Sequence, residues 1–557
     1  MSKIDYTSWS QDELIREIEK FKAHKKYGIV WEEKLETVAE RCKDELPVLE
    51  EVKTKALPLN GEVTNIFIEG DNYHVLSVLN YTHKGQIDVI YIDPPYNRGT
   101  GDHFIYNDKI VDLEDSYRHS KWLSFMNKRL RLAKTLLKHT GIIFISIDDY
   151  EQAQLKLLCD EIFDQENFVG NLVWHKKYGG GSDNKNIVTE HEYVLCYSNG
   201  EKEVFQNLEF DFDETLGFEG PDEQGRYYKT EGLLMRGPNS SSSARPNLCY
   251  PIKCPDGTEL WPREKKGTWR YSKETLQDEI KKNNIVFKQN KNGWMVYYKI
   301  FLYNEKGEER GKKARSILNY RYNIGQTGEG TARVKELLGT GAFNNPKPVS
   351  LIKHLIKLCK KSDVVLDFFA GSGTTAEAVL MLNKEDGGNR QFIICTDNQD
   401  NNGSGLKIAE DICYPRIKTV MKELQKEHTL LRESSPNLKY FKTTFVNAKP
   451  TDENKKRLVL KSTEMLCLKE SCFDKLIEKD YFRIYKNNKN KFLGIICEDE
   501  GIESFKKELI KLNKKATVYV FSLDDSTREE EFEDVAGLVE LRPIPAVILN
   551  VYKRIFK

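Results

Sequence analysis

Hydrophobic and polar residues follow two patterns along this chain. Short, mainly apolar runs predict buried strands at 87–92, 142–147, 193–197, 364–368 and 392–396. Between them, apolar residues recur every three or four positions, as in 116–138 and 351–356, which predicts amphipathic helices. Strands that alternate with helices are typical of a mostly parallel sheet with helices on both faces. We therefore expect an α/β fold.

The pattern changes at both ends of the chain and in its middle. Ser10-Gln11-Asp12-Glu13 fits a capping box and precedes apolar residues at helical spacing, which predicts an N-terminal helix. Residues 201–223 are acidic, and a serine-rich polar loop follows them. Five segments are therefore predicted: a helical segment 1–55, a first α/β half 56–200, an insert 201–345, a second α/β half 346–430 and a C-terminal α/β domain 431–557.

Composition narrows the class of protein. The 557 residues are 39% hydrophobic, with 86 Lys+Arg against 86 Asp+Glu, so the chain is neither disordered nor uniformly basic. No apolar run approaches the ~18 residues of a membrane span, and no hydrophobic signal segment is visible at the start. The eleven cysteines form no Cys-x-x-Cys pair. We expect a reduced, cytoplasmic protein without a membrane partner.

One part of the insert is strongly basic. Residues 261–321 hold 16 Lys/Arg against 7 Asp/Glu, and tryptophans and tyrosines are interleaved with them. A basic stretch with aromatic residues favours contact with nucleic acid. The candidate DNA-binding residues are Arg263, Lys265, Lys266 and Arg270. The alternative is a basic face that is merely solvated.

A first chemical motif, Asp93-Pro94-Pro95-Tyr96, follows directly after the predicted strand 87–92. Two prolines stiffen the turn and remove two backbone donors, so the Asp93 carboxylate and the Pro94 carbonyl are acceptors with few local donors. Such a pair suits an exocyclic amino group, and Tyr96 offers a flat face on which a planar base can stack. The alternative is an ordinary proline turn in which Asp93 caps a helix.

A second motif lies between the predicted strand 364–368 and a helix that runs to residue 382. It reads Asp367-Phe368-Phe369-Ala370-Gly371-Ser372-Gly373-Thr374-Thr375. The two glycines let the backbone approach a ligand closely, at a helix N-terminus whose amide groups face outward. It is not a phosphate-binding P-loop, and it lacks the third glycine of a dinucleotide fingerprint. Gly-Ser-Gly taken alone also suits a simple tight turn.

Together the two motifs resemble those of amino-group DNA methyltransferases, which use Asp-Pro-Pro-Tyr for catalysis and Phe-x-Gly-x-Gly for S-adenosylmethionine. The catalytic motif comes first here, and the cofactor motif begins 271 residues after Tyr96. This order is similar to that of the β-class, a circular permutation of the Rossmann-like methyltransferase fold. The resemblance implies that 56–200 is the catalytic half, 201–345 a target-recognition insert and 346–430 the cofactor-binding half.

The likeness extends to the Mod (modification) subunits of type III restriction–modification systems. The segments that resemble them are 68–72, 91–97, 119–126, 345–348, 438–443 and 541–545. This resemblance implies a bacterial, cytosolic, site-specific methyltransferase that acts on adenine N6 in double-stranded DNA. It also implies a homodimer that works with a separate ATP-dependent nuclease-helicase subunit.

The resemblance assigns roles to individual residues. Asp93, Pro94, Pro95 and Tyr96 would form the catalytic site for a flipped adenine, with Tyr96 stacked on its ring. The cofactor loop would comprise Asp367, Phe368, Phe369, Gly371, Ser372, Gly373, Thr374 and Thr375. Lys347 and Pro348 would complete the methionine pocket. Asp71 with Asn72 would read the cofactor's adenine, although Asp71 is equally well explained as a helix N-cap.

The acidic residue for the cofactor ribose departs from the family pattern. Relatives commonly have Asn-Glu after the strand that corresponds to 392–396, whereas this chain reads Thr396-Asp397-Asn398-Gln399-Asp400. Gln399 stands at the glutamate position, so Asp397 or Asp400 would have to replace it. Asp397 is our candidate.

Other interpretations remain open on the sequence alone. Cytosine N4 methylation is one alternative, although Ser is usual at the first motif position there, so Asp93 favours adenine. Protein-amide or RNA methylation is another, and a DNA-recognition subunit with a vestigial methylation site is a third.

His191-Glu192 precedes a strand, but neighbouring strand residues point to opposite faces, so we expect a structural role and no metal.

Overall fold

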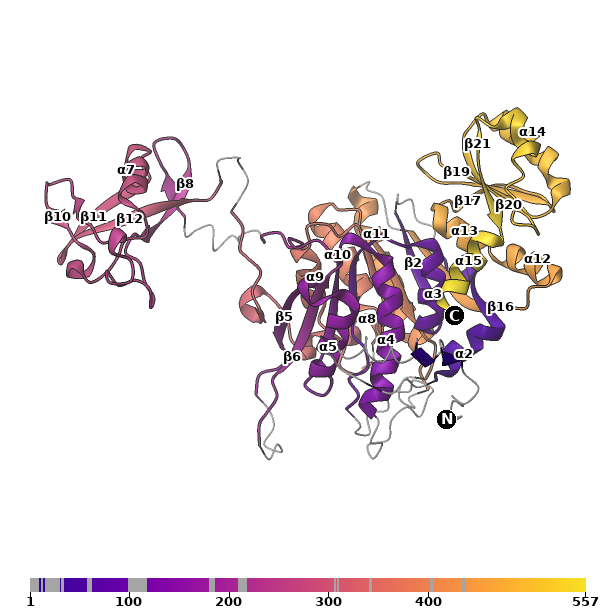
Figure 1. Cartoon of the computed structure of the whole chain (residues 1–557), viewed down its shortest axis with the longest axis horizontal. Coiled ribbons are helices and arrows are strands. Elements are labelled where there is room, and N and C mark those ends of the chain that lie inside the picture. The colour runs from indigo at the N-terminus through magenta and orange to yellow at the C-terminus, as the bar shows by residue number, and fades with distance from the viewer. Residues whose placement is uncertain are drawn as a thin grey trace. The chain divides into compact units, whose positions relative to one another are not determined.

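The computed structural model describes residues 35–556 except 58–62, 99–117, 180–185, 209–217, 305–306, 308–309, 340–342, 401–404 and 432–436, together with 10, 11, 14, 15 and 31. The chain forms two compact units, residues 1–205 with 315–557 and residues 206–314 (Figure 1). The second unit is shorter than the predicted insert 201–345, because residues on both sides of 206–314 pack with the first unit. The helix predicted after Ser10 lies largely outside the described residues.

A ten-stranded sheet forms the centre of the first unit. Its order across the sheet is β1 (Glu45–Glu51), β16 (Asn437–Asn447), β2 (Thr64–Glu69), β15 (Gln391–Thr396), β14 (Val364–Asp367), β3 (Ile87–Ile92), β4 (Leu137–Ile147), β6 (His191–Ser198), β5 (Phe168–His175) and β13 (Ile317–Leu318). The strands from β16 to β4 run parallel, whereas β1 and β6 pair antiparallel with their neighbours. The predicted strands and the expected α/β fold class are therefore confirmed.

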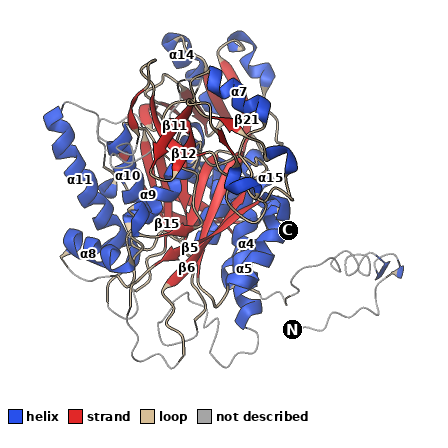
Figure 2. Ribbon diagram, turned by 90° about the vertical axis from the view of Figure 1, so that its left-hand side faces the viewer, coloured by secondary structure: helices blue, strands red, loops and turns tan. Residues whose placement is uncertain are grey.

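Helices cover both faces of this sheet. The first part of the chain contributes α3 (Asn72–Thr82), α4 (Arg118–Leu136) and α5 (Gln152–Phe163). The later group comprises α8 (Thr327–Leu338), α9 (Val349–Leu358), α10 (Thr374–Asp386) and α11 (Tyr414–Leu431). Figure 2 shows α4 and α5 on one side of the strands and the later group on the other. The helices predicted within 116–138 and over 351–356 correspond to α4 and α9.

The chain diverges in opposite directions from two adjacent strands at the middle of the sheet. Strands β14 and β3 pair in parallel, with Leu366 opposite Ile90. From β14 the chain passes through α10 to β15 on one side, and from β3 it passes through α4 to β4 on the other. Right-handed crossovers in opposite directions place their helices on opposite faces. A crevice therefore opens at the carboxyl ends of β14 and β3, where ligands bind in such sheets.

The order of these two strands along the chain is permuted. The β3–α4–β4 half precedes the β14–α10–β15 half, and the second compact unit is inserted between the two. The strand arrangement is therefore the circularly permuted Rossmann-like fold that the order of the motifs predicts.

The second unit, 206–314, has a small core of its own. Its four-stranded antiparallel sheet has the order β11 (Ile285–Asn290), β12 (Gly293–Phe301), β8 (Tyr227–Gly232) and β7 (Glu219–Pro221). Helix α7 (Lys273–Lys281) and the pair β9 (Ile252–Lys253) and β10 (Glu259–Leu260) complete the unit. Leu233, Trp269 and Val296 are buried together in its core. A separate core is what an inserted domain requires in order to fold as a unit.

The C-terminal region adds a second, five-stranded sheet to the first unit. Its order is β17 (Asp474–Glu478), β18 (Phe482–Lys486), β19 (Phe492–Ile496), β20 (Ala516–Phe521) and β21 (Val539–Ile544). The accompanying helices are α12 (Asp452–Lys461), α13 (Thr463–Glu470), α14 (Ile502–Leu512) and α15 (Ala546–Ile555), while α2 (Thr37–Asp44) precedes β1. Helices α13 and α15 pack against α3. None of the helices in the described ranges is both long and apolar enough to cross a membrane.

Candidate active site

A cavity of about 460 Å³ lies at the crevice between β14 and β3. It is lined by segments that follow β2, β3, β14 and β15, together with residues 343–347 and parts of β5 and β6. All of the predicted catalytic and cofactor residues line it except Pro348 and Gly373. Pro348 instead forms the N-cap of α9, and Gly373 forms the N-cap of α10. The tertiary fold therefore brings the two sequence motifs to one cavity.

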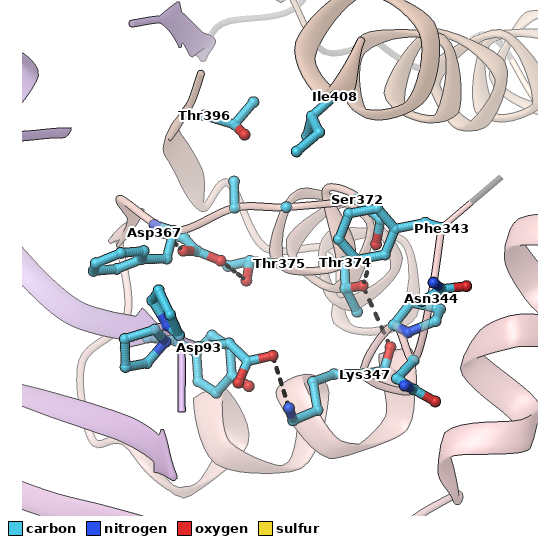
Figure 3. Close-up of a pocket in the computed structure, with 18 of the residues that line it drawn as sticks. Asp93, Phe343, Asn344, Lys347, Asp367, Ser372, Thr374, Thr375, Thr396 and Ile408 are labelled. Atoms are coloured by element: carbon cyan, nitrogen blue, oxygen red, sulfur yellow. Dashed lines mark hydrogen bonds and ion pairs between the residues drawn. The ribbon is translucent and has the colours of Figure 1, made fainter. Parts of the chain in front are cut away.

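Asp367 holds the glycine loop in place. Its Oδ1 accepts a hydrogen bond from the Phe369 amide at 2.9 Å, and its Oδ2 accepts one from Thr375 Oγ1 at 2.5 Å (Figure 3). Only 2% of Asp367 is exposed, and this burial raises its pKa to about 7 even though both hydrogen bonds lower it. The carboxyl group therefore joins the end of β14 to the first turn of α10.

The two glycines of this loop need conformations that other residues rarely adopt. Gly371 has φ +49° and Gly373 has φ +84°, both in the left-handed region. A Cβ on Gly371 would lie 3.1 Å from the Phe343 ring, and one on Gly373 would lie 3.0 Å from Cys413 Sγ. The loop consequently approaches Phe343 closely and turns sharply into α10.

Arg416, on α11, supports the loop and was not found by sequence reasoning. Its side chain is fully buried, and Nη1 donates to Ser372 Oγ at 2.8 Å and to Thr374 Oγ1 at 2.9 Å. Its Nε forms an ion pair with Glu377 at 2.8 Å. A buried arginine far along the chain carries no local sequence signal that would connect it with the loop.

Asp71 has the helix N-cap role that the sequence allowed, while its contact with the cofactor's adenine stays a prediction. It is the N-cap of α3, where its Oδ1 accepts from the Tyr73 amide at 2.8 Å, and it also lines the cavity. The neighbouring Asn72 is almost fully buried and donates to the Phe368 carbonyl at 3.2 Å. Asn72 thereby joins α3 to the glycine loop.

The departure at the predicted ribose position can now be located in space. Asp397 and Asp400 both line the cavity, whereas Gln399 does not. Within the described part of the chain, Gln399 Oε1 is buried without a hydrogen-bond partner. Burial, reinforced by the charge of Asp71, raises the pKa of Asp397 to about 6. Two acidic side chains, Asp71 and Asp397, therefore lie near each other in the lining of the cavity.

Two side chains donate to the Asp93 carboxylate. The sequence predicts few local donors, and one donor comes from the motif itself, since Tyr96 Oη donates to Oδ1 at 2.6 Å. The other comes from a distant segment of the chain, where Lys347 Nζ donates to Oδ2 at 2.7 Å (Figure 3). The motif itself is fixed by Trp122, whose Nε1 donates to the Pro95 carbonyl at 2.7 Å.

Lys347 is a buried cation at the centre of the site. Its Nζ also lies 2.8 Å from Tyr96 Oη and 3.3 Å from Glu192 Oε2, and only 8% of the residue is exposed. Burial by itself lowers the pKa of Lys347, but the carboxylates of Asp93 and Glu192 outweigh it and raise the pKa above its ordinary value. The ammonium is therefore charged and directed at the catalytic motif.

Glu192 is a cavity residue to which the sequence analysis gave only a structural role. Its carboxylate lies 3.2 Å from Tyr96 Oη, 3.1 Å from Lys176 Nζ and 3.3 Å from Arg98 Nη2. Burial raises its pKa, but Lys347, Lys176 and Arg98 together lower it below the usual range. Strand alternation separates His191 from Glu192 as predicted, but it does not reveal which face of β6 meets a cavity.

Metal ligands do not cluster in the described ranges. There, no group of three or more His, Cys, Asp or Glu side chains is arranged to hold a metal ion. The charged groups that line the cavity are three lysines, an arginine and carboxylates, and tyrosine, asparagine, serine and threonine side chains accompany them. These groups act by accepting and donating hydrogen bonds.

The four candidate DNA-binding residues lie close together in the second unit. Arg263, Lys265, Lys266 and Arg270 are all exposed. The ammonium of Lys265 lies 4.6 Å from the centre of the Trp261 ring, and Arg270 Nη2 is 3.5 Å from Glu231. Arg263, Lys265 and Lys266 have no carboxylate of the described residues within ion-pair distance. Basic and aromatic groups thus face solvent together.

The fold and the cavity define a class of protein, the Rossmann-like methyltransferases in their permuted form. Residues 87–401 match the family model described as DNA methylase, and the chain belongs to this family. It is 35% identical over 410 residues to the type III restriction-modification enzyme StyLTI Mod subunit of Salmonella typhimurium, covering 68% of this chain and 60% of that protein. It is 35% identical over 388 residues to the type II methyltransferase M.KpnI of Klebsiella pneumoniae, covering 65% of this chain and 89% of that protein.

Likeness to solved structures is weaker. The complex of M1.HpyAVI with SAM aligns with 61% of this chain and 98% of its own, at 13% identity and a TM-score of 0.27. The chain spans about 60% of the length of the StyLTI Mod subunit that it matches.

Proposed function

We propose that this protein is an S-adenosylmethionine-dependent DNA methyltransferase that modifies N6 of a flipped adenine in double-stranded DNA. The observation that carries the proposal is the position of the two motifs. Asp93-Pro94-Pro95-Tyr96 follows β3, the glycine loop follows β14, and these adjacent parallel strands open into one cavity. Two ligands bound there, one on each motif, would meet at the switch point of the sheet.

On the β3 side, the chain supplies acceptors for an amino group. The Asp93 carboxylate would accept one N–H of the adenine amino group, and the Pro94 carbonyl would accept the other. The Tyr96 ring lines the same cavity and offers a face for stacking. Extrusion of a base costs a few kcal/mol, which the stacking and these hydrogen bonds would offset. The amino nitrogen would then be held with its lone pair directed toward the β14 side.

On the β14 side, the residues fit S-adenosylmethionine. Gly371 permits close approach of the backbone, and Asp71 and Asp397, which line the same cavity, would provide carboxylates for the adenine and ribose groups. When bound, the cofactor supplies an electrophilic methyl group. The chain needs neither a nucleophile nor a metal for this transfer, because its contribution is position and charge placement.

The second unit would recognise DNA. Its exposed basic segment carries Arg263, Lys265, Lys266 and Arg270, and these cations would neutralise phosphates.

The likeness to StyLTI Mod supports a role as the modification and recognition subunit of a type III restriction–modification system. In that role the chain would form a homodimer and would require a separate ATP-dependent nuclease-helicase subunit to cut DNA. Light-scattering mass measurement tests the dimer, since a monomeric mass at working concentration would contradict it.

Nucleoside mass spectrometry tests the reaction. Purified protein is incubated with unmethylated plasmid DNA and S-adenosylmethionine, and the DNA is digested to nucleosides. We expect N6-methyladenine in amounts that grow with enzyme and time. N4-methylcytosine without methylated adenine would assign the other target base, and no methylated nucleoside would contradict the proposed reaction.

A further inference from the structure

The ammonium of Lys347 occupies the place that a substrate amino group would need. In the proposed function, the adenine amino nitrogen lies within hydrogen-bond distance of Asp93 and beside the Tyr96 ring. Lys347 Nζ is already 2.7 Å from Asp93 Oδ2 and 2.8 Å from Tyr96 Oη. Its distance from the centre of the Tyr96 ring is 5.1 Å. Both groups are nitrogen donors directed at one carboxylate, so they compete for the same position.

Both oxygens of the Asp93 carboxylate already accept a hydrogen bond. Oδ1 accepts from Tyr96 and Oδ2 accepts from Lys347. Each carboxylate oxygen can accept more than one hydrogen bond, so an entering amino group would share an oxygen with one of these donors or displace it, and on Oδ2 its competitor is a buried ammonium. Figure 3 shows the lysine side chain reaching across the cavity toward Asp93.

A second carboxylate is close enough to receive the displaced ammonium. Glu192 Oε2 is 3.3 Å from Lys347 Nζ, and Glu192 is itself buried. Displacement from Asp93 would otherwise leave a buried cation without a partner, which is costly. Glu192 therefore makes the movement of Lys347 feasible, and its own position is fixed by Lys176 and Arg98.

We infer that Lys347 is a placeholder for the amino group of the target base, and that it moves from Asp93 to Glu192 when the flipped base enters. The inference rests on the proposed function and deepens it. It assigns Lys347 to the base site, whereas the resemblance assigns it to the methionine pocket. It also adds a basis for selectivity: a base that presents a carbonyl at this position cannot donate to Asp93 and so cannot replace the ammonium there. Glu192 is then a positioning residue that acts through Lys347.

Steady-state kinetics on Lys347→Met separates this role from others. Removal of the placeholder should lower KM for DNA about tenfold if the ammonium holds the position ~90% of the time. The kcat should change little, because Lys347 has already left Asp93 in the reacting complex. Lys176→Met is the matched control, since it removes a cation from the same cavity and the same Glu192 without touching Asp93. It should not lower KM.

Glu192→Gln should have the opposite effect. Without a charged acceptor for the displaced ammonium, Lys347 should stay on Asp93, and KM for DNA should rise about tenfold. The double variant Lys347→Met/Glu192→Gln should return to the low KM of Lys347→Met, because the defect acts through the lysine. A purely structural role of Glu192 would give additive effects instead, and the double variant would then have a KM near the parent's, because the two single changes act in opposite directions.

Three outcomes would overturn the inference. A kcat that falls about 100-fold in Lys347→Met at unchanged KM would mean that the lysine stays on Asp93 during transfer. A cofactor dissociation constant that rises about tenfold in this variant, with KM for DNA unchanged, would return Lys347 to the methionine pocket. Additive effects in the double variant would remove the coupling with Glu192.

Two further measurements keep the test decisive. Thermal unfolding checks each variant, and if Lys347→Met does not fold, Lys347→Arg replaces it. A guanidinium binds a carboxylate through two hydrogen bonds, so Arg should hold Asp93 more firmly and raise KM. An unchanged or lower KM in Lys347→Arg would contradict the placeholder role of Lys347. The product of the parent protein is measured first, so that failure of the methyltransferase proposal is distinguishable from failure of this inference.

Discussion

Lys347 Nζ lies 2.7 Å from Asp93 Oδ2, although 254 residues separate the two in the sequence. The whole second unit, 206–314, is inserted between them. This ion pair joins the β3 half of the site to the β14 half, because the Lys347 carbonyl also accepts from Thr374 Oγ1 at 3.3 Å. The Asp-Pro-Pro-Tyr motif and the glycine loop are thus connected through one lysine.

Asp93→Ala should abolish methylation while DNA and cofactor binding persist. The variant removes the charged acceptor for the base amino group, and removal of one preorganised group of this kind typically lowers kcat about 100-fold or more. Lys347 keeps Glu192 as a partner, so the fold should survive. Nucleoside mass spectrometry and cofactor titration measure both effects.

Asp149→Ala, which removes an exposed carboxylate, is the control. Methylation by Asp93→Ala near the parent rate would disprove the role of Asp93.

Cofactor affinity should depend on pH through Asp397. Its pKa is raised to about 6, so below pH 6 the group is mostly protonated and is a weaker acceptor for the ribose hydroxyls. The dissociation constant should therefore fall as pH rises from about 5 and level off above about 7, with a slope of up to about tenfold per unit. Asp397→Asn should bind weakly and without this dependence. An unchanged pH profile in that variant would assign the ribose contact to another residue, with Asp400 as the next candidate.

Gly373→Ala should destabilise the protein and weaken cofactor binding. The residue has φ +84°, and a Cβ would contact Cys413 Sγ at 3.0 Å, so backbone strain and a steric clash add together. Gly387→Ala is a matched control at the other end of α10, because it has φ +68° but open space around the Cβ. The control should lose about 1–2 kcal/mol of unfolding free energy, the cost of the left-handed backbone alone, with normal cofactor affinity. Equal losses in both variants would show that the clash at Gly373 is relieved.

Replacement of Arg263, Lys265, Lys266 and Arg270 by Ala should flatten the salt dependence of DNA binding. For every phosphate that the variant no longer neutralises, the slope of log affinity against log salt should decrease by about 0.9. Fluorescence anisotropy over a salt series gives this slope. A variant with Lys489, Lys514, Lys515 and Lys553 replaced by Ala removes four exposed charges from the C-terminal region and controls for net charge. A slope equal to the parent's in the first variant would place the DNA elsewhere.

The amino-acid sequence was sufficient to predict the central strands, the helices between them and the two motifs. Runs such as 87–92 and 392–396 are mainly apolar because strands that are buried on both faces need mostly apolar side chains, so their pattern can be recognised without knowledge of the fold. Gly371 and Gly373 could be recognised in the sequence for a similar reason, because a left-handed turn before a helix favours glycine locally. These features depend on neighbours along the chain.

The folded structure shows which charged groups contact each other. The ion pair of Asp93 with Lys347, the support of Ser372 by Arg416 and the contact of Glu192 with Tyr96 all join residues that lie far apart along the chain. Gln399 and Asp397 show the same limit, because the turn after β15 determines which side chain faces the cavity. Local patterns record burial and backbone conformation, whereas a contact between distant residues is fixed by strand order and by the packing of helices across the sheet. The chemistry of this site therefore depends on Lys347 and Glu192, which the local pattern could not assign to Asp93.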